Sequence, residues 1–130
     1  MLFTTKTEYG LKALGVLAKS GKNEAVSLAV IARQTGLSLS YLEQIFAKLK
    51  IAGIITSVKG VEGGYALSRP AKAIGLLAII QALEGKTAVN NCMAGARKSC
   101  SSKCLTRKVW EEIQNNLEKT LKKYSLKDLV

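Results

Sequence analysis

Apolar residues recur at helical spacing along most of the chain. The first apolar stripe lies between Leu11 and Ala18 and is followed by Gly21. Two shorter stripes come next, each preceded by a serine, Ser27 or Ser38, and followed by a glycine. Because serine caps the first turn of a helix and glycine ends the last one, this pattern predicts helices over residues 5–20, 28–34 and 38–51.

The first of these helices has a specific start signal. Thr5-Lys6-Thr7-Glu8 has the spacing of a capping box. In that motif the Thr5 hydroxyl accepts a hydrogen bond from the Glu8 amide, and the Glu8 carboxylate accepts one from the Thr5 amide. The sequence therefore predicts that Thr5 opens the helix and that Glu8 closes its first turn.

The middle of the chain changes to strand-like spacing. Residues 54–58 are rich in β-branched side chains, residues 65–68 alternate weakly, and several glycines lie between them. This pattern predicts a β-hairpin with a glycine-rich tip. Further helices are expected over 74–83 and 105–124, followed by a short capped tail. The predicted fold class is therefore mainly α with one small hairpin.

The two helices on either side of Gly36 have the spacing of a helix-turn-helix. Ala32 is small where the helices would cross, Gly36 suits the turn, and Leu42 fills the space between the helices. A β-hairpin directly after such a unit is the wing of a winged helix. This arrangement is typical of DNA binding, although an adaptor domain could use the same unit to bind a protein.

The third predicted helix has a polar face that suits a recognition helix. Its apolar side chains occupy one face, so Ser40, Tyr41, Gln44 and Lys48 lie on the other. Hydroxyl and amide groups read base edges, and lysines meet phosphates. Glu43 has two interpretations: it accepts a hydrogen bond from a cytosine amino group, or it serves surface solubility or an intramolecular ion pair.

The tip of the predicted wing is a second candidate DNA contact. Lys59 is followed by Gly60, which lets the backbone approach another molecule closely. An ordinary hairpin tip is the alternative, but its position directly after the recognition helix favours contact with a phosphate or the minor groove.

The charge of the chain favours a polyanionic partner. Its 130 residues include 20 lysines and arginines against 9 acidic residues, a net charge of +11. No secretory signal is visible, and the longest apolar run, residues 73–80, is too short to cross a bilayer, so we expect a cytoplasmic protein without a membrane segment. The lack of histidine, and of a nucleophile with an evident partner, argues against an enzyme.

Three cysteines form the strongest chemical signal. Cys92, Cys100 and Cys104 lie within thirteen residues that also hold three basic side chains and no acidic one. In the cytoplasm, clustered thiols indicate metal binding or redox chemistry rather than a structural disulfide. The alternatives are an iron–sulfur cluster, a cluster-free thiol switch between Cys100 and Cys104, and structural zinc, which suffers from the lack of histidine and of a fourth cysteine.

The last predicted helix suggests self-association. Its apolar stripe consists of Trp110, Ile113, Leu117, Leu121 and Tyr124. Because this helix follows an already complete domain, the stripe is predicted to pack against a second copy. The resulting division is a winged helix-turn-helix domain at 1–85, a sensor loop at 86–104, and a dimerisation helix with its tail at 105–130.

Several blocks together resemble one family, the winged-helix regulators that include the iron–sulfur cluster assembly regulator IscR, the nitric-oxide sensor NsrR and the cysteine-metabolism regulator CymR. The resemblance covers essentially the whole chain. The blocks are Ser38-Leu39-Ser40-Tyr41-Leu42-Glu43-Gln44, Lys48-Leu49 with Ala52-Gly53, Ser57-Val58-Lys59-Gly60 with Gly63-Gly64-Tyr65, Ala82-Leu83-Glu84-Gly85, the three cysteines, and Cys104-Leu105-Thr106 with Trp110.

The resemblance implies a homodimer that reads a partly palindromic operator and, in the cluster-binding members, carries an iron–sulfur cluster that alters DNA binding. Carried over to this sequence, it implies that Ser38, Ser40, Tyr41, Glu43 and Gln44 read DNA, that Lys59 is the wing contact, and that Cys92, Cys100 and Cys104 are cluster ligands.

Two features depart from that family pattern. IscR-like members use a histidine three residues after the last cysteine, where this chain has Arg107. NsrR-like members use a carboxylate from the first helix of the partner subunit, and the matching residue here is Glu8. The cysteine spacing is also uneven, with seven residues between the first pair and three between the second. The expected cofactor is a [2Fe–2S] cluster, with [4Fe–4S] or none as alternatives.

Overall fold

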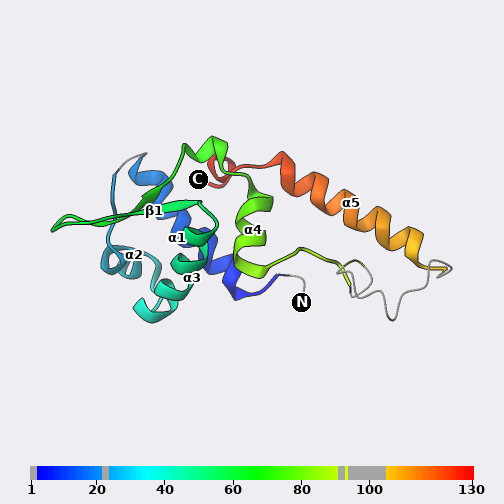
Figure 1. Cartoon of the computed structure of the whole chain (residues 1–130), viewed down its shortest axis with the longest axis horizontal. Coiled ribbons are helices and arrows are strands. Elements are labelled where there is room, and N and C mark those ends of the chain that lie inside the picture. Colours follow the sequence, from blue (N-terminus) through cyan, green and yellow to red (C-terminus); the bar gives the residue numbers. More distant parts are fainter. Residues whose placement is uncertain (1–2, 22–23, 91–92, 94–104) are drawn as a thin grey trace.

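The computed structural model describes residues 3–21, 24–90, 93 and 105–130. Three helices, one hairpin and two further helices follow one another in the order predicted. The fold is a winged helix-turn-helix with an additional C-terminal helix (Figure 1). The elements are α1 (Thr5–Ser20), α2 (Leu28–Thr35), α3 (Leu39–Ile51), β1 (Ile55–Val58), β2 (Gly64–Leu67), the 3₁₀ turn η1 (Ala71–Ala73), α4 (Leu76–Glu84), α5 (Arg107–Lys123) and the 3₁₀ turn η2 (Leu126–Leu129).

The helix-turn-helix has the caps that the sequence predicts. The Ser27 hydroxyl accepts a hydrogen bond from the Val30 amide at 3.3 Å, and the Ser38 hydroxyl accepts one from the Tyr41 amide at 3.2 Å. Gly36 adopts a left-handed conformation with φ of 74°, which a residue with a side chain adopts only with strain. These local interactions fix where α2 ends and where α3 begins.

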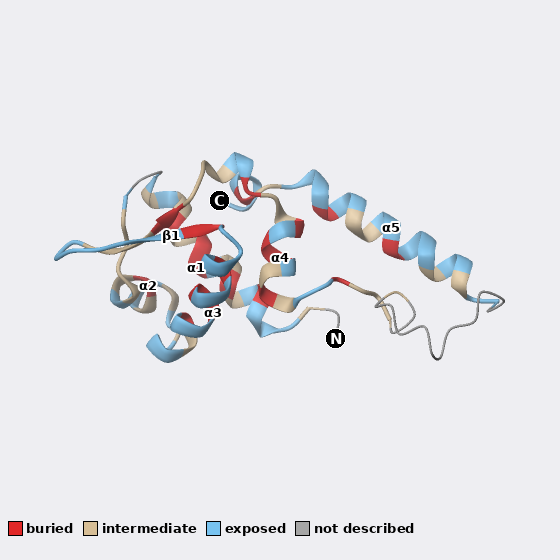
Figure 2. Cartoon of the chain, in the orientation of Figure 1, coloured by how far each residue is buried: buried red, intermediate tan, exposed pale blue. Residues whose placement is uncertain are grey.

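The core lies between α1, α3, α4 and the hairpin. Fully buried apolar side chains from each of these elements meet there, and Figure 2 shows buried segments on their facing sides. Phe46 of α3 packs edge-on against Tyr65 of β2, with ring centroids 5.0 Å apart. This packing leaves only the outer face of α3 in contact with solvent.

The wing is an antiparallel hairpin anchored at its base. Ile55 pairs with Leu67 and Val58 with Gly64. Ile55 and Leu67 are buried, whereas Val58 and the residues up to Glu62 are exposed. The tip therefore projects from the body, as Figure 1 shows.

The start of α1 differs from the predicted capping box. The cap is Thr4, not Thr5, and the Thr4 hydroxyl accepts a hydrogen bond from the Lys6 amide at 3.2 Å. The acidic group at this helix end is Glu84, at the end of α4: its carboxylate accepts hydrogen bonds from the Thr4 amide at 3.4 Å, the Thr7 amide at 3.2 Å and the Thr4 hydroxyl. Glu84 thus supplies from a distant element what a capping box supplies locally.

Helix α5 extends away from the body, as Figure 1 shows, and contacts it mainly near its C-terminal end. Leu121 is buried and Leu117 half-buried against Leu77 and Ile80 of α4. The prediction that the whole stripe faces a second copy is therefore wrong for Leu117 and Leu121, because α4 of the same chain covers them. In the described part of the chain, no helix is long and apolar enough to span a membrane.

The C-terminal tail, which follows α5, packs back against the winged helix-turn-helix body instead of continuing the helix. Leu126 is completely buried in the main core, and its amide donates to the Ile74 carbonyl at 2.8 Å. The predicted cap at Ser125 is confirmed, since Asp128 and Ser125 form a reciprocal capping box. The core that supports α3 therefore also anchors the segment directly after the C-terminal end of α5.

Candidate nucleic-acid interface

The predicted base-reading residues gather on the outer face of α3. Leu42, Ile45, Phe46 and Leu49 are buried, and this fixes the rotation of the helix. Ser40, Glu43, Gln44 and Lys48 are exposed as a result, together with Ser38 at the cap. Tyr41 is half-buried. The structure thus brings the predicted α3 residues together on one face, whereas Lys59 and Gly60 lie apart from them on the wing.

Ser38 combines a structural contact with a free donor. Its oxygen accepts from the Tyr41 amide, which leaves the hydroxyl proton available to another acceptor. A phosphate or base acceptor at the N-terminus of α3 suits this group, because the unpaired amides of that first turn also attract negative charge.

Tyr41 connects the recognition helix to α1. Its ring packs edge-on against Tyr9 with centroids 5.8 Å apart, and its hydroxyl lies 3.5 Å from the Thr5 hydroxyl. The half-buried ring is therefore held in place by α1. The sequence did not predict these contacts, because they join residues more than thirty positions apart.

Glu43 is exposed on the edge of the outer α3 face that lies away from Tyr41. It makes no ion pair with any described residue, so the intramolecular pair considered for it is not found within that part of the chain. The remaining interpretations are contact with a base and surface solubility.

Lys48 points toward the C-terminus of α4. Its Nζ donates to the Leu83 carbonyl at 3.5 Å, where the negative end of a helix favours a cation. Although the side chain is exposed, partial desolvation there, and then the positive charge of Lys6, lower the pKa of Lys48, while Glu84 opposes the shift. Lys6 was not predicted from sequence, since nothing in its local pattern indicates that the first turn of α1 lies beside α3.

The wing tip exposes a cation and an apolar side chain. Lys59 and Gly60 are exposed, and Gly60 has a φ of 117° that favours glycine. A Cβ on Gly63 would collide with the Val58 carbonyl, so this glycine is needed for the close turn. Val61 is fully exposed next to them. Sequence analysis missed Val61, which adds an apolar surface to the tip.

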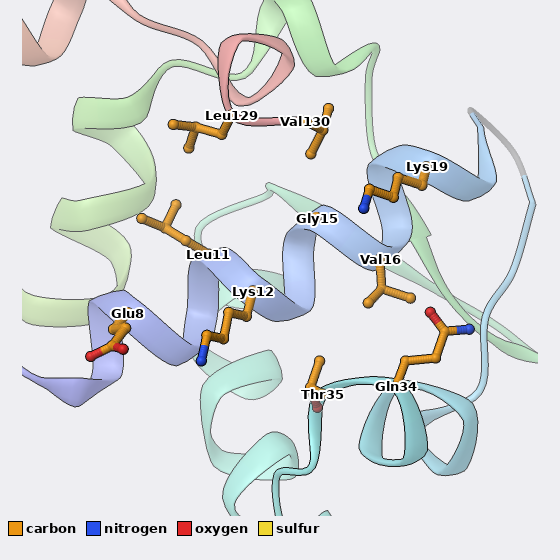
Figure 3. Close-up of a pocket in the computed structure, with 10 residues that line it drawn as sticks. All are labelled: Glu8, Leu11, Lys12, Gly15, Val16, Lys19, Gln34, Thr35, Leu129 and Val130. Atoms are coloured by element: carbon orange, nitrogen blue, oxygen red, sulfur yellow. The ribbon is translucent and has the colours of Figure 1, made fainter.

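The cysteine part of the predicted metal site, Cys92, Cys100 and Cys104, lies outside the described residues. Glu8, its fourth predicted ligand, is described. Its carboxylate is exposed and forms no hydrogen bond or ion pair with described residues. It lines a groove of about 630 Å³ between α1 and the C-terminal tail, one turn before Lys12 (Figure 3). No group of three or more metal-ligating side chains occurs within the described part of the chain.

The segment that leads into the cysteine loop is fastened to α5. The buried side-chain amide of Gln114 donates to the Thr87 carbonyl at 2.6 Å and accepts from the Val89 amide at 2.9 Å. Glu118 accepts a second hydrogen bond from the same amide at 3.0 Å. Gln114 therefore holds the segment around Thr87 and Val89 against α5.

Comparisons with known proteins agree with this geometry. The chain matches the Rrf2 family, described as an iron-dependent transcriptional regulator, over residues 3–130. ORF2 of Azotobacter vinelandii is 40% identical over all of this chain and 79% of its own length. The structure of CymR, the global cysteine regulator of B. subtilis, has a TM-score of 0.82 at 32% identity, covering 98% of this chain and 94% of its own.

The structure of IscR from T. potens is similarly close, with a TM-score of 0.79 at 35% identity, covering 98% of this chain and 84% of its own. These relatives are regulators and not enzymes, in agreement with the sequence. A family match over nearly the whole chain, together with the winged helix-turn-helix and its exposed polar α3 face, leads to one conclusion: the chain belongs to the Rrf2 family of DNA-binding transcriptional regulators.

Proposed function

We propose that this protein is a homodimeric, cytoplasmic repressor or activator that reads a partly palindromic operator through α3. The observation that carries the proposal is the outer face of α3, on which Ser40, Glu43 and Gln44 are exposed together while the opposite face is completely buried. A rigid helix with hydroxyl, amide and carboxylate groups on its free face suits the major groove. Lys59 at the wing adds a phosphate contact.

Helix α5 supports the dimer in this proposal. Ile113 of the stripe is 41% exposed, and Val109, at the edge of the stripe, is 57% exposed. A second copy would bury both. Two α3 helices related by a two-fold axis would then read half-sites about one helical turn, ~34 Å, or a multiple of it apart.

The sensor in this proposal is a [2Fe–2S] cluster held by Cys92, Cys100, Cys104 and Glu8, with residues 1–85 reading DNA, 86–104 sensing and 105–130 dimerising. The donor set fits: three thiolates and one carboxylate bring an oxidised cluster to a charge of about −2, which the basic residues of the loop offset. Bound there, the cluster would supply sensitivity to oxidation state and to small reactive ligands.

The state of the Glu8 carboxylate favours this assignment. The predicted alternative was a capping role, but Thr4 caps α1 and Glu84 takes the acidic position of the box. Glu8 is therefore left exposed on α1 without a hydrogen bond to any described residue. The relatives include both IscR and CymR, so a [4Fe–4S] cluster and a cluster-free thiol switch are the competing sensors.

Base reading is tested with Gln44→Ala and Lys59→Ala in DNA-binding titrations. Gln44→Ala should cost about 1–3 kcal/mol at one base step, whereas Lys59→Ala should weaken every sequence similarly. Equal loss on all sequences for Gln44→Ala would remove its base-reading role. Binding to a protein but to no genomic DNA fragment would favour a protein-interaction module instead.

The sensor is tested by the visible spectrum and iron content of anaerobically purified protein. The wild type should be coloured, Glu8→Ala should have an altered spectrum, and Glu24→Ala, which removes an exposed carboxylate elsewhere, should match the wild type. A colourless, iron-free wild type would instead favour the thiol switch.

A further inference from the structure

The first turn of α1 lies directly beside the outer face of the recognition helix. The Thr5 hydroxyl is 3.5 Å from the Tyr41 hydroxyl. Lys6 lines a small cavity together with Tyr41, Gln44 and Lys48. Lys6 and Lys48 also line an adjoining groove of about 470 Å³, together with Glu84 and Gly85. Two lysines from different elements therefore share one hollow next to a predicted base-reading side chain.

This hollow is positively charged and lacks a free carboxylate. Both lysines are exposed, and neither forms an ion pair with the described residues. The one acidic side chain in the groove, Glu84, already accepts hydrogen bonds from Thr4 and Thr7. Desolvation, and then the positive charge of Lys6, lower the pKa of Lys48. Two neighbouring cations outnumber the single carboxylate of Glu84, whose hydrogen bonds go to Thr4 and Thr7, and this excess positive charge favours binding of an anion.

The position of the hollow on α3 identifies the anion. Ser40 and Gln44 are one turn apart and mark the centre of the outer face, whereas Tyr41 and Lys48 are two turns apart and mark the edge nearest α1. When a helix occupies the major groove, its edges face the phosphates that border the groove, about 12 Å apart. The α1 edge of α3 therefore faces one of the two phosphate backbones.

We propose that Lys6 and Lys48 together bind a backbone phosphate of DNA, so that the first turn of α1 is a further DNA contact of this protein. The proposal rests on the proposed function, because it requires α3 to enter the major groove. Phosphate binding at this position would fix how deeply α3 enters the groove, and it would carry no base preference of its own.

The test is a salt titration of binding by fluorescence anisotropy, with the full-length chain. Two duplexes are used: one selected by the wild-type protein from a random pool, and one with the same composition in scrambled order. Lys6→Gln should weaken binding to both duplexes by the same factor and reduce the slope of log K against log salt by about 1. Lys6→Gln/Lys48→Gln removes both contacts to that one phosphate, so it should weaken binding further while the total loss of slope stays about 1.

Lys19→Gln is the matched control, because Lys19 is exposed at the opposite end of α1 and should leave the slope unchanged. Lys6→Arg keeps the charge and should restore the slope. Equal thermal melting of all variants would show that they are folded.

The outcomes separate this proposal from the proposed function. If the wild type binds no DNA, the proposed function fails. If the wild type binds but Lys6→Gln keeps its affinity and slope, the phosphate contact is overturned and the proposed function stands. A calorimetric titration with inorganic phosphate covers the other source of the anion. Phosphate binding that depends on Lys6, together with an unchanged DNA slope, would also overturn the proposal.

Discussion

Helices α3 and α5 have similar apolar stripes but different surroundings. The stripe of α3 is covered along its whole length by its own chain, with Leu42, Phe46 and Leu49 completely buried. The stripe of α5 is covered by its own chain at Leu117 and Leu121, whereas Val109 and Ile113 remain exposed. The same periodicity therefore predicts a helix and its apolar face in both cases, but it does not predict which molecule covers that face.

The largest difference between the two helices should appear in Phe46→Ala. Phe46 is completely buried against Tyr65, so truncation leaves a cavity and should lower the free energy of unfolding by about 3–5 kcal/mol. Urea unfolding followed by circular dichroism measures this change. In dilute, monomeric protein, Val109→Ala on the exposed part of α5 should change the value by no more than about 0.5 kcal/mol. Similar losses for both variants would contradict the comparison.

A charge on the α5 stripe should affect association instead of folding. Ile113→Lys introduces a cation into the apolar surface that the proposed second copy would cover. It should weaken the dimer by about 2–4 kcal/mol, a roughly thirty-fold or greater increase in the dissociation constant. Sedimentation equilibrium measures this constant. Asn115→Lys adds the same charge to the opposite face and serves as the control. A dimer that tolerates Ile113→Lys would place the interface elsewhere.

Local signals explain most of what the sequence predicted correctly. Ser27, Gly36 and Ser38 set the ends of α2 and α3 through contacts within four residues, so the helix-turn-helix could be read directly. The exposed set on α3 followed from the same pattern, since four buried side chains determine which face remains free. Glycines similarly predicted the hairpin.

The features that sequence analysis missed depend on contacts between distant residues. Thr4 and Glu84 are 80 positions apart, so no local pattern could show that Glu84 replaces Glu8 at the start of α1. Lys6 was overlooked for the same reason, because only packing of α1 against α3 and α4 brings it to Lys48. The partial cover of α5 likewise depends on a distant element, since Leu77 and Ile80 of α4 pack against Leu117 and Leu121.

The hydrogen bonds of Gln114 test whether α5 holds the segment that leads into the cysteine loop. Gln114→Ala removes both hydrogen bonds to the Thr87 carbonyl and the Val89 amide. It should cost about 1–3 kcal/mol, because these backbone groups lose a buried partner. Hydrogen exchange should accelerate at Val89. Asn116→Ala, an exposed amide on the same helix, should leave this exchange unchanged. Unchanged protection of Val89 in Gln114→Ala would mean that α5 does not hold this segment.

The smallest predicted effect concerns Glu84, which links α1 to the end of α4 within the body. Burial raises its pKa, but the hydrogen bonds from Thr4 and Thr7 outweigh this, so the pKa of Glu84 is lower than its ordinary value. A lowered pKa in the folded state means that the ionised form stabilises the fold. This stability is complete well above the ordinary glutamate pKa of about 4.3 and is lost as the pH falls through the lower folded-state value.

Glu84→Gln should therefore lower the free energy of unfolding by about 1 kcal/mol at neutral pH, because a neutral amide oxygen accepts weaker hydrogen bonds. The gap between wild type and variant should narrow as the pH is lowered, since the wild-type carboxylate is then also neutral. Urea unfolding at neutral and acidic pH measures this change, with Glu62→Gln on the exposed wing as a control that shows no gap at either pH. A gap that does not change with pH would mean that the shape of the side chain, and not its charge, holds α1 to α4. The contact between α1 and α4 would then depend on packing, as the apolar face of α3 does, and acid would not weaken it.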